Sequence, residues 1–299
     1  MCDSKEGRAE QPLSGSDVWT VGARTLNVSR RPHIMGILNV TPDSFSDGSL
    51  FLDPGKAVER ALEMEAEGAD SIDIGGESTR PFAPPVDEDQ ELGRVLPVIE
   101  VLAGRLRIPI SIDTYKASVA REAIRAGAEI VNDISGGTFD PRMLEVVSSS
   151  SAGLIVMHTR GTPTEMQRDT AYSALIPEII SFLRERLSAA AAAGISATRI
   201  VVDPGIGFGK SLQGNLEILR NLEQLAVLDR PILVGTSRKS FIGTILGREA
   251  GDRTFGTAAT IALAVAKGAS IFRVHDVRQM RDAAMIAHTV MRPPAPCNT

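Results

Sequence analysis

The chain has 299 residues, 43% of them hydrophobic, and a formal net charge of −5 at pH 7. This length and composition suit one large domain, and the negative charge argues against a nucleic-acid partner, which needs a clustered basic surface. The sequence contains no apolar stretch near the ~20 residues of a membrane span, so we expect a cytoplasmic protein with a small-molecule partner.

The two ends of the chain are expected to lie outside the folded domain. Residues 1–16 are rich in Ser, Gly, Glu and Gln, and residues 292–299 form a short tail, so both are predicted to be unstructured. The two cysteines, Cys2 and Cys297, lie in these tails, and a disulfide between them is an alternative that a reducing compartment disfavours. A single domain is expected over residues 17–291.

Residues 17–30 place alternating apolar residues around Gly22-Ala23. This pattern predicts a β-hairpin, which could close the bottom of the domain that follows.

From Ile34 onward, short apolar runs alternate with helical patterns. Several helices end in Gly-Ala followed directly by a β-branched run, as at Gly68, Gly127 and Gly268, because glycine permits the left-handed cap. Helices are expected at 55–67, 87–105, 116–126, 141–149, 173–193, 214–228, 254–267 and 277–290. Eight strands and eight helices in strict alternation predict an α/β fold, a (β/α)8 TIM barrel with an N-terminal β-hairpin. A doubly wound open sheet is the alternative, but the glycine fingerprint after its first strand is missing.

Each of the eight apolar runs stops at a polar or charged residue. The runs and their endings are Ile34 to Asn39, Ile72 to Arg80, Ile108 to Asp113, Ile130 to Asp133, Leu154 to His158, Ile200 to Asp203, Ile232 to Lys239, and Ile271 to His275. Because the carboxyl ends of the strands build the active site of such a barrel, these endings predict one pocket.

Positive groups gather at three of these endings. Arg forks suit bidentate phosphate recognition, and the loops after barrel strands 7 and 8 often hold phosphate, so a phosphorylated substrate is expected. The residues are Arg80, Arg238, Lys239, Arg273 and His275. The structural alternative is that Arg238 and Lys239 form a solvated helix start while Arg273 pairs with a neighbouring acid. Ser237 could cap the helix expected from Ser240 or help a carboxylate dock there.

Hydrogen-bond acceptors gather at three other endings: Asp113, Asn132 and Asp203. Carboxylates and amides at converging strand ends suit a flat heterocycle with several N–H donors. Asp73 lies inside its strand, and we assign it a structural role.

Two familiar site types are disfavoured. The segment Gly205 to Ser211 resembles a phosphate-binding P-loop, but Pro204 stands where the motif needs its first glycine. His158 and His275 lack the partners of a zinc site. Mg²⁺ held through substrate phosphates and one protein oxygen, such as that of Asn39, fits the sequence better.

The chain resembles the dihydropteroate synthase family from Ile34 to about Ile286. Seven motifs carry the resemblance in order: Met35–Gly48, Asp73–Pro81, Ser111–Thr114, Val131–Ile134, Asp203–Lys210, Thr236–Ser240 and Arg273–Val277. The resemblance implies an enzyme that joins p-aminobenzoate to 7,8-dihydropterin-6-ylmethyl diphosphate in folate synthesis, releasing diphosphate and 7,8-dihydropteroate. It also suggests a homodimer formed through barrel helices away from the pocket.

The resemblance implies a division of roles among the site residues. Asp113, Asn132, Asp203 and Lys239 would hold the pterin. Asn39, Thr79, Arg80, Arg273 and His275 would hold the diphosphate with Mg²⁺, and Asn39 would be the protein ligand of that ion. The p-aminobenzoate would be surrounded by Phe45, Pro81, Phe208, Ser237 and Lys239. The catalytic residues would be Asp113, Lys239, Arg273 and His275.

The sequence departs from the family pattern at two places. Phe82 stands where relatives usually carry Gly, and Thr159 stands where Met is common. The loops Thr41–Phe51 and Ser78–Pro85 are expected to close over bound ligand. No insertion interrupts Phe208-Gly209, so sulfonamide sensitivity is expected.

Two rival functions share the pterin-binding barrel. A methyltetrahydrofolate corrinoid methyltransferase has no diphosphate to hold. The positive groups at Arg80, Ser237 to Lys239 and Arg273 to His275 therefore favour the synthase. A non-catalytic pterin-binding paralogue is the second rival, and no motif suggests such decay.

Overall fold

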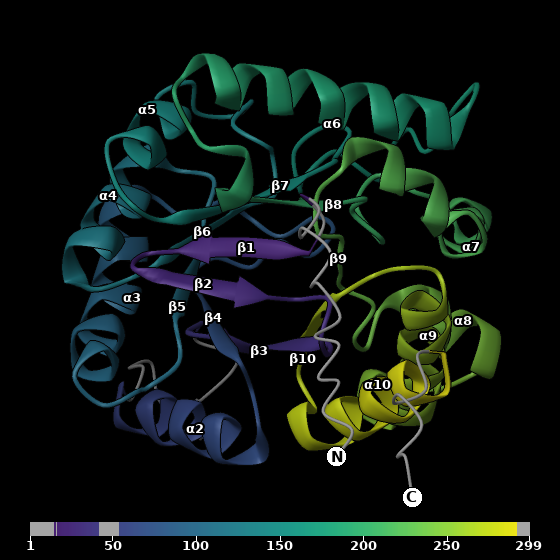
Figure 1. The fold of residues 1–299 in the computed structure, drawn as a ribbon, viewed down its shortest axis with the longest axis horizontal. Helices are drawn as coiled ribbons and strands as arrows, with labels where there is room; N and C mark the ends of the chain where they lie inside the picture. Colours follow the sequence, from purple (N-terminus) through teal and green to yellow (C-terminus); the bar gives the residue numbers. More distant parts are fainter. Residues whose placement is uncertain (1–14, 16, 42–53, 292–299) are drawn as a thin grey trace, which may run out of the picture.

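The computed structural model describes Gly15, residues 17–41 and residues 54–291. Parallel strands form a sheet in the order β8-β7-β6-β5-β4-β3-β10-β9 (Figure 1). A bridge between Val202 and Ile232 joins β8 to β9, and the N–H of Val202 donates to Pro231 O at 3.0 Å. The sheet therefore closes, which confirms the predicted barrel and rules out the open sheet. The strands are β3 (His33–Asn39), β4 (Ser71–Gly75), β5 (Ile110–Asp113), β6 (Ile130–Asp133), β7 (Gly153–Met157), β8 (Ile200–Asp203), β9 (Leu233–Val234) and β10 (Ile271–Val274).

Helices surround the strands and cover their outer faces (Figure 1). They are α2 (Pro54–Glu67), α3 (Glu88–Ala103), α4 (Ala117–Ala126), α5 (Met143–Ser148), α6 (Leu175–Ala192), α7 (Leu212–Arg220), α8 (Ser240–Leu246), α9 (Thr254–Ala266) and α10 (Val277–Met291). The expected glycine caps are confirmed: Gly68, Gly127 and Gly268 have φ of 99°, 119° and 93°. No helix of the described ranges combines the length and apolarity that crossing a membrane requires.

Two details of the predicted alternation were wrong. The helix predicted at 214–228 is α7 followed by a 3-10 segment, η2 (Leu222–Leu228). The break falls at Asn221, whose side-chain amide donates to Glu217 O at 2.9 Å and so competes with the main chain. Strict alternation also fails after β9, because α8 and α9 both precede β10. Gly247, with φ of 65°, ends α8 in a left-handed cap and separates the two helices.

The predicted hairpin is confirmed and closes one end of the barrel. Strands β1 (Val18–Val21) and β2 (Arg24–Asn27) pair antiparallel and cross the near face of the barrel in Figure 1. Trp19 is fully buried, and its indole N–H donates to Arg199 O at 3.1 Å. It belongs to a cluster with inward-facing residues of six strands: Met35, Ile130, Ile155, Val201, Leu233 and Ile271.

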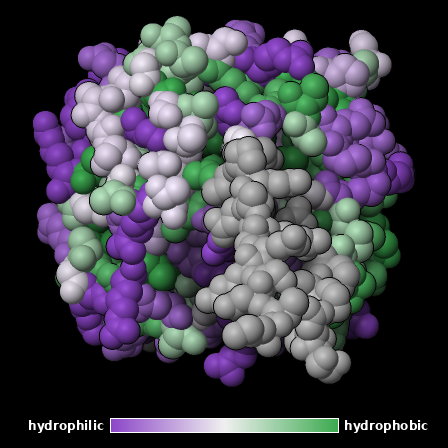
Figure 2. Space-filling model, viewed as in Figure 1, coloured by the Kyte–Doolittle hydropathy of each residue, from purple (hydrophilic) through white to green (hydrophobic). Residues whose placement is uncertain are grey.

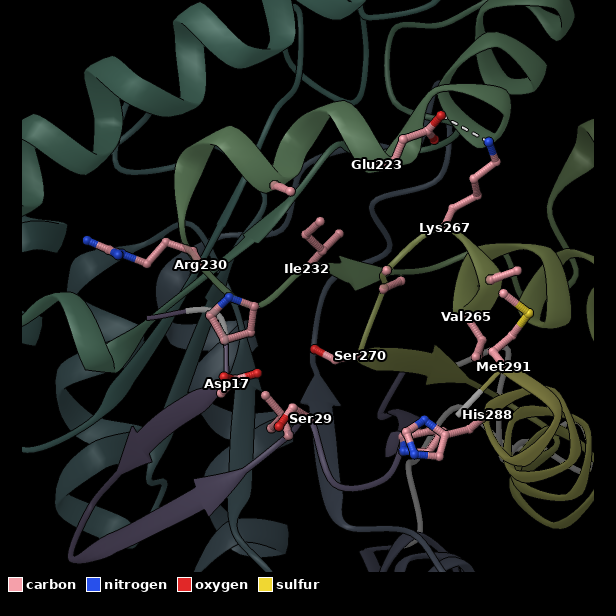
Figure 3. A pocket seen from close by; sticks show the side chains of 17 residues that line it. Asp17, Ser29, Glu223, Arg230, Ile232, Val265, Lys267, Ser270, His288 and Met291 are labelled. Atoms are coloured by element: carbon pink, nitrogen blue, oxygen red, sulfur yellow. Dashed lines mark hydrogen bonds and ion pairs between the residues drawn. The ribbon is translucent and has the colours of Figure 1, made fainter. Parts of the chain in front are cut away.

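A cavity of about 360 Å³ lies at this same end, beside the hairpin and the ends of α9 and α10 (Figure 3). Its lining mixes Asp17, Ser29, Lys267, Ser270 and His288 with apolar residues. Lys267 pairs with Glu223 at 3.0 Å across its rim. The cavity is therefore distant from the strand endings that the sequence predicts to form the site.

Candidate active site

The opposite end of the barrel interior is polar and charged. Side chains alternate along a strand, so β6, β8 and β10 each continue from an inward apolar residue to an inward polar one two positions later. Asp113 pairs in register with Gly75 on one side and Asn132 on the other. Asp113, Asn132 and Asp203, which the sequence brings forward as acceptors, are all buried at this end.

Arg273 is the centre of this polar layer. Its Nε lies 2.5 Å from Asp73 Oδ2, and its Nη2 lies 2.6 Å from Asp113 Oδ2. Asp73 Oδ2 also accepts the side-chain amide of Asn132 at 2.9 Å. Burial alone would lower the pKa of Arg273, but the Asp73 and Asp113 carboxylates raise it above its usual range. Four strands thus contribute to one hydrogen-bonded network around a permanent positive charge.

The carboxylates of this network keep unused acceptor atoms. Asp73 Oδ1 and Asp113 Oδ1 are buried and accept no hydrogen bond from any described residue. Burial raises the pKa of Asp113 to about 7, although Arg273 opposes the rise. Buried acceptors of this kind require donors, and a heterocycle with several N–H groups would supply them.

Asp203 and Lys239 form the neighbouring wall. Burial raises the pKa of Asp203 to about 6, and its Oδ1 accepts the N–H of Gly205 at 2.7 Å. Burial, together with the charge of Arg273, lowers the pKa of Lys239 to about 8. The Lys239 ammonium lies 4.1 Å from the centre of the Phe208 ring, a cation–π contact. Lys239 and Phe208, which the resemblance assigns to the same substrate, are therefore side by side.

Ser237 and His275 form a fixed pair at the ends of β9 and β10. Ser237 Oγ lies 2.9 Å from His275 Nδ1 and accepts the backbone N–H of His275 at 3.1 Å. Burial, and after it the charge of Arg238, lowers the pKa of His275 to about 3. The ring is neutral, so the Ser237 hydroxyl can donate to Nδ1 while Nε2 carries the proton. His275 then presents an N–H donor without a net charge.

One prediction for this loop was wrong. Ser237 does not cap α8, because Lys239 is the N-cap residue and Ser237 binds His275 instead. Arg238 pairs with an acid, because its Nη2 lies 2.5 Å from Asp276 Oδ1, and its charge still contributes to the lowered pKa of His275. Arg238 also has a left-handed φ of 57°.

The remaining predicted residues lie on the loops around this pocket. Asn39 ends β3 beside Gly75 of β4. Thr79, Arg80 and Pro81 follow β4, where Arg80 and Pro81 are exposed. The positive charge of Arg80 contributes to the lowered pKa of His275, after those of Arg238 and Arg273. Phe45 and most of the loop Thr41–Phe51 lie outside the described residues.

The departure at Phe82 has a structural counterpart. Phe82 has a φ of 65° and its side chain is 65% exposed. Glycine adopts this left-handed conformation without the steric cost that an L side chain such as Phe82 meets. The Phe82 N–H donates to Pro163 O at 3.0 Å and joins the loop after β4 to the loop after β7. At the second departure, the Thr159 hydroxyl lies 3.3 Å from Gly161 O.

Sequence reasoning missed two participants. Asp73 had been given a structural role inside its strand, yet it binds both Arg273 and Asn132. The period-2 alternation of Ile72, Asp73 and Ile74 could have shown that it faces inward. Lys210 is buried, and its ammonium lies 3.0 Å from His158 Nδ1 and 2.8 Å from Phe208 O. It thereby fixes the loop that presents Phe208.

The structure also bears on metal binding. No group of three or more His, Cys, Asp or Glu side chains within the described ranges could hold a metal ion. The carboxylates of the polar layer are paired with Arg273 or with a backbone N–H, which leaves single oxygen atoms as donors. Such a donor set suits an ion that takes most of its ligands from a substrate.

Comparisons with known proteins agree with this geometry. A family model described as pterin binding enzyme matches residues 35–275. The dihydropteroate synthase of Synechocystis is 47% identical and covers 91% of this chain and 94% of its own, and that of Bacillus subtilis is 43% identical and covers 95% and 97%.

Solved structures lead to the same family. The Yersinia pestis dihydropteroate synthase with a sulfonamide drug complex has a TM-score of 0.86 and 42% identity, covering 91% of this chain and 98% of its own. The Xanthomonas albilineans enzyme with 4-aminobenzoic acid has a TM-score of 0.87 and 41% identity, covering 93% and 100%. The chain therefore belongs to the pterin-binding enzymes and, within them, to the dihydropteroate synthases, which are transferases.

Proposed function

We propose that this chain performs the dihydropteroate synthase reaction in the pocket around Arg273. The observation that carries the assignment is the pair of buried acceptors, Asp73 Oδ1 and Asp113 Oδ1, beside Asn132. They suit the N–H-rich edge of a dihydropterin, and the contacts of Arg273 with both carboxyl groups hold them in place. Asp203 and Lys239 complete the proposed pterin wall.

The proposed reaction breaks one bond and forms another. The C–O bond between the pterin methylene and the diphosphate breaks, and its electron pair leaves with the diphosphate. The p-aminobenzoate nitrogen forms a C–N bond to that carbon and then loses a proton. Positive charge develops on the pterin side, where the carboxylate of Asp113 stabilises it. Such an electrostatic contact contributes about 2.7 to 4 kcal/mol in comparable sites.

The loops supply the proposed diphosphate site. Arg80 brings positive charge, Thr79 a hydroxyl, and the neutral ring of His275 a donor N–H. Arg273 has Nη1 left over, because its bonds to Asp73 and Asp113 use Nε and Nη2. The p-aminobenzoate would lie beside Phe208, Lys239, Ser237 and Pro81, with Phe45 as a further proposed contact.

We also propose Mg²⁺ as the cofactor, with Asn39 as its protein ligand. The donor set supports an ion bound mainly through phosphate oxygens, because Asn39 offers one amide oxygen at a strand end. Bound there, Mg²⁺ would neutralise charge on the leaving diphosphate.

The test is diphosphate release from the purified protein with dihydropterin diphosphate and Mg²⁺, with and without p-aminobenzoate. Release that requires p-aminobenzoate and yields dihydropteroate is the expected result. Tight pterin binding without release would favour a non-catalytic paralogue. Methyl transfer from methyltetrahydrofolate to a corrinoid would favour the methyltransferase alternative, which leaves Arg80 and His275 without a substrate group.

The same pocket supports sulfonamide sensitivity. A relative from Yersinia pestis was crystallised with a sulfonamide drug complex. In this chain, the Lys239 ammonium contacts the Phe208 ring, and no insertion interrupts Phe208-Gly209. Inhibition that p-aminobenzoate relieves competitively is expected, and full activity at saturating sulfonamide would contradict it.

We further propose that the enzyme is a homodimer, joined through α8, α9 and α10. Most of the exposed large hydrophobic residues in the described part of the chain lie there: Ile245, Leu246, Phe255, Leu263, Ile286, Val290 and Met291. Figure 2 shows apolar residues at the right-hand edge, where α8 and α9 lie in Figure 1. Phe255 is 90% exposed and shares a helix face with Leu263, eight residues later.

Sedimentation of the wild type and of Phe255→Asp tests the dimer. Association of the wild type and its loss in Phe255→Asp are expected, while Val101→Asp on α3 is the matched control. A monomeric wild type would remove the proposal.

A cytoplasmic location is proposed as well, because the described residues contain no cysteine and so no disulfide that a reducing compartment would break.

A further inference from the structure

A buried ionic cluster lies behind the loop that follows β4. The ammonium of Lys116 contacts Glu77 Oε2 and lies 2.5 Å from Glu91 Oε2. The Tyr115 hydroxyl donates to Glu77 Oε1 at 2.7 Å. The side chains of Glu77, Glu91 and Lys116 are 5%, 1% and 12% exposed. None of these residues takes part in the reaction as described above.

The cluster ties three parts of the fold together. Glu77 belongs to the loop after β4, Glu91 to α3, and Lys116 is the N-cap residue of α4. The loop also passes close to α3: a Cβ on Gly76 would lie 2.8 Å from Val95 Cγ1 and 3.0 Å from Glu91 Cγ. Arg94 Nη1 donates to Gly76 O at 2.7 Å. The first half of the loop is therefore held firmly from outside the barrel.

The second half of this loop carries the proposed diphosphate ligands. Thr79 and Arg80 follow Glu77 by two and three residues. Their side chains make no hydrogen bond or ion pair with the described residues. The charge of Arg80 makes a small contribution to the lowered pKa of His275. Glu77 is the last side chain of the loop that is anchored before Thr79.

Burial of this cluster costs desolvation free energy that offsets much of what its ion pairs contribute to stability. Two carboxylates surround one ammonium, and burial raises the pKa of Glu91 even though Lys116 opposes the rise. Buried ion pairs are often replaceable by apolar side chains without loss of stability. Apolar contacts are not directional, whereas charged hydrogen bonds are. Several of them therefore fix the position of a loop more narrowly than apolar packing does.

We propose that Glu77 and Lys116 are positioning residues that hold Thr79 and Arg80 in place for the diphosphate of the substrate. The inference rests on the proposed function, because the diphosphate is the group that this loop would receive. Displacement of such a group by about 1 Å can cost on the order of 10²-fold in rate. The effect should reach the substrate through Arg80 and leave the pterin contacts at Asp113 and Asn132 unchanged.

The test is a double-mutant cycle with two kinds of measurement. Glu77→Gln and Lys116→Met are each made in the wild type and in an Arg80→Ala background. In the wild type, kcat/KM and the affinity for dihydropterin diphosphate should both fall by about tenfold or more. Affinity for the dihydropterin alcohol, which lacks diphosphate, should stay within about twofold. In the Arg80→Ala background, the same substitutions should cost less than about threefold.

Controls separate positioning from general damage. Lys267→Met removes an ion pair at the opposite end of the barrel and should change neither affinity. Glu77→Gln keeps the shape of the side chain, so it still tests the positioning role if Lys116→Met fails to fold. Equal losses with and without Arg80, or an equal loss for the alcohol, would overturn the proposal. The affinity measurements need no turnover, so failure of the proposed reaction would show separately as absent p-aminobenzoate-dependent diphosphate release.

Discussion

The two ends of the barrel interior are built from the same strands but contain opposite chemistry. On β6, Ile130 joins the apolar cluster around Trp19, and Asn132, two residues later, binds Asp73. On β10, Ile271 lies in that cluster and Arg273 in the charged network. Two residues along a strand therefore separate the apolar cluster around Trp19 from the charged network around Arg273.

This contrast shows how the fold tolerates buried charge. The hairpin end excludes water with a Trp side chain, while the opposite end pairs each buried carboxylate with Arg273 or with a backbone N–H. The apolar end should determine stability, and the charged end should determine catalysis. The predictions below test that separation.

Trp19→Ala should have the largest effect and should affect stability. Truncation of a fully buried Trp costs about 3 to 5 kcal/mol in the free energy of unfolding. Denaturant titration measures this loss, and kcat/KM of the folded fraction should stay within about twofold. A large loss of kcat/KM in folded Trp19→Ala would show that the two ends are coupled.

Arg273→Ala and Lys239→Ala should affect the charged end. Each should lower kcat/KM by at least about tenfold, roughly 1.4 kcal/mol, in steady-state assays. Arg273→Ala should also destabilise the protein, because it leaves the buried carboxylates of Asp73 and Asp113 without their cation. Arg31→Ala, which removes a half-exposed pair with Asp70, is the matched control. Near-normal activity in both variants would remove the assigned roles.

The pH dependence should report the same charges. Asp113 becomes negative as the pH rises through about 7, and Lys239 loses its positive charge as the pH rises through about 8. We expect kcat/KM to rise through the first value and fall above the second, while His275, with a pKa of about 3, stays neutral throughout. Lys239→Arg should remove the fall on the basic side. A basic limb that persists in that variant would assign it to another group.

Phe82→Gly should have the smallest effect. Relief of the left-handed strain at φ of 65° opposes the greater entropy of the unfolded chain, so the free energy of unfolding should rise by less than about 1 kcal/mol. Asp229→Gly, at φ of 49° near the hairpin end, is the matched control and should gain less because Asp tolerates this region. A loss of stability in Phe82→Gly would mean that the exposed ring makes a stabilising contact.

Much of this architecture could be predicted from local patterns. The alternation of apolar runs and helices predicts the barrel, and the Gly-Ala phrases predict helix ends that the structure confirms at Gly68, Gly127 and Gly268. Strict alternation failed after β9, because the helix expected from Ser240 and the helix expected at 254–267 both form there, as α8 and α9. The capping role predicted for Ser237 was wrong, because a serine before a helix is a common cap and only its contact with His275 shows otherwise.

The sequence by itself determined which residues end the strands, because side-chain alternation and helix caps are set by near neighbours. The tertiary structure alone decided which of these residues share a partner. Arg273 meets Asp73 and Asp113 across sequence separations of 200 and 160 residues. Lys116 likewise pairs with Glu77 and Glu91 only because a loop packs against two helices. Such pairings depend on the closure of the barrel, which brings distant strand ends within hydrogen-bond distance and removes the water that would otherwise separate their charges.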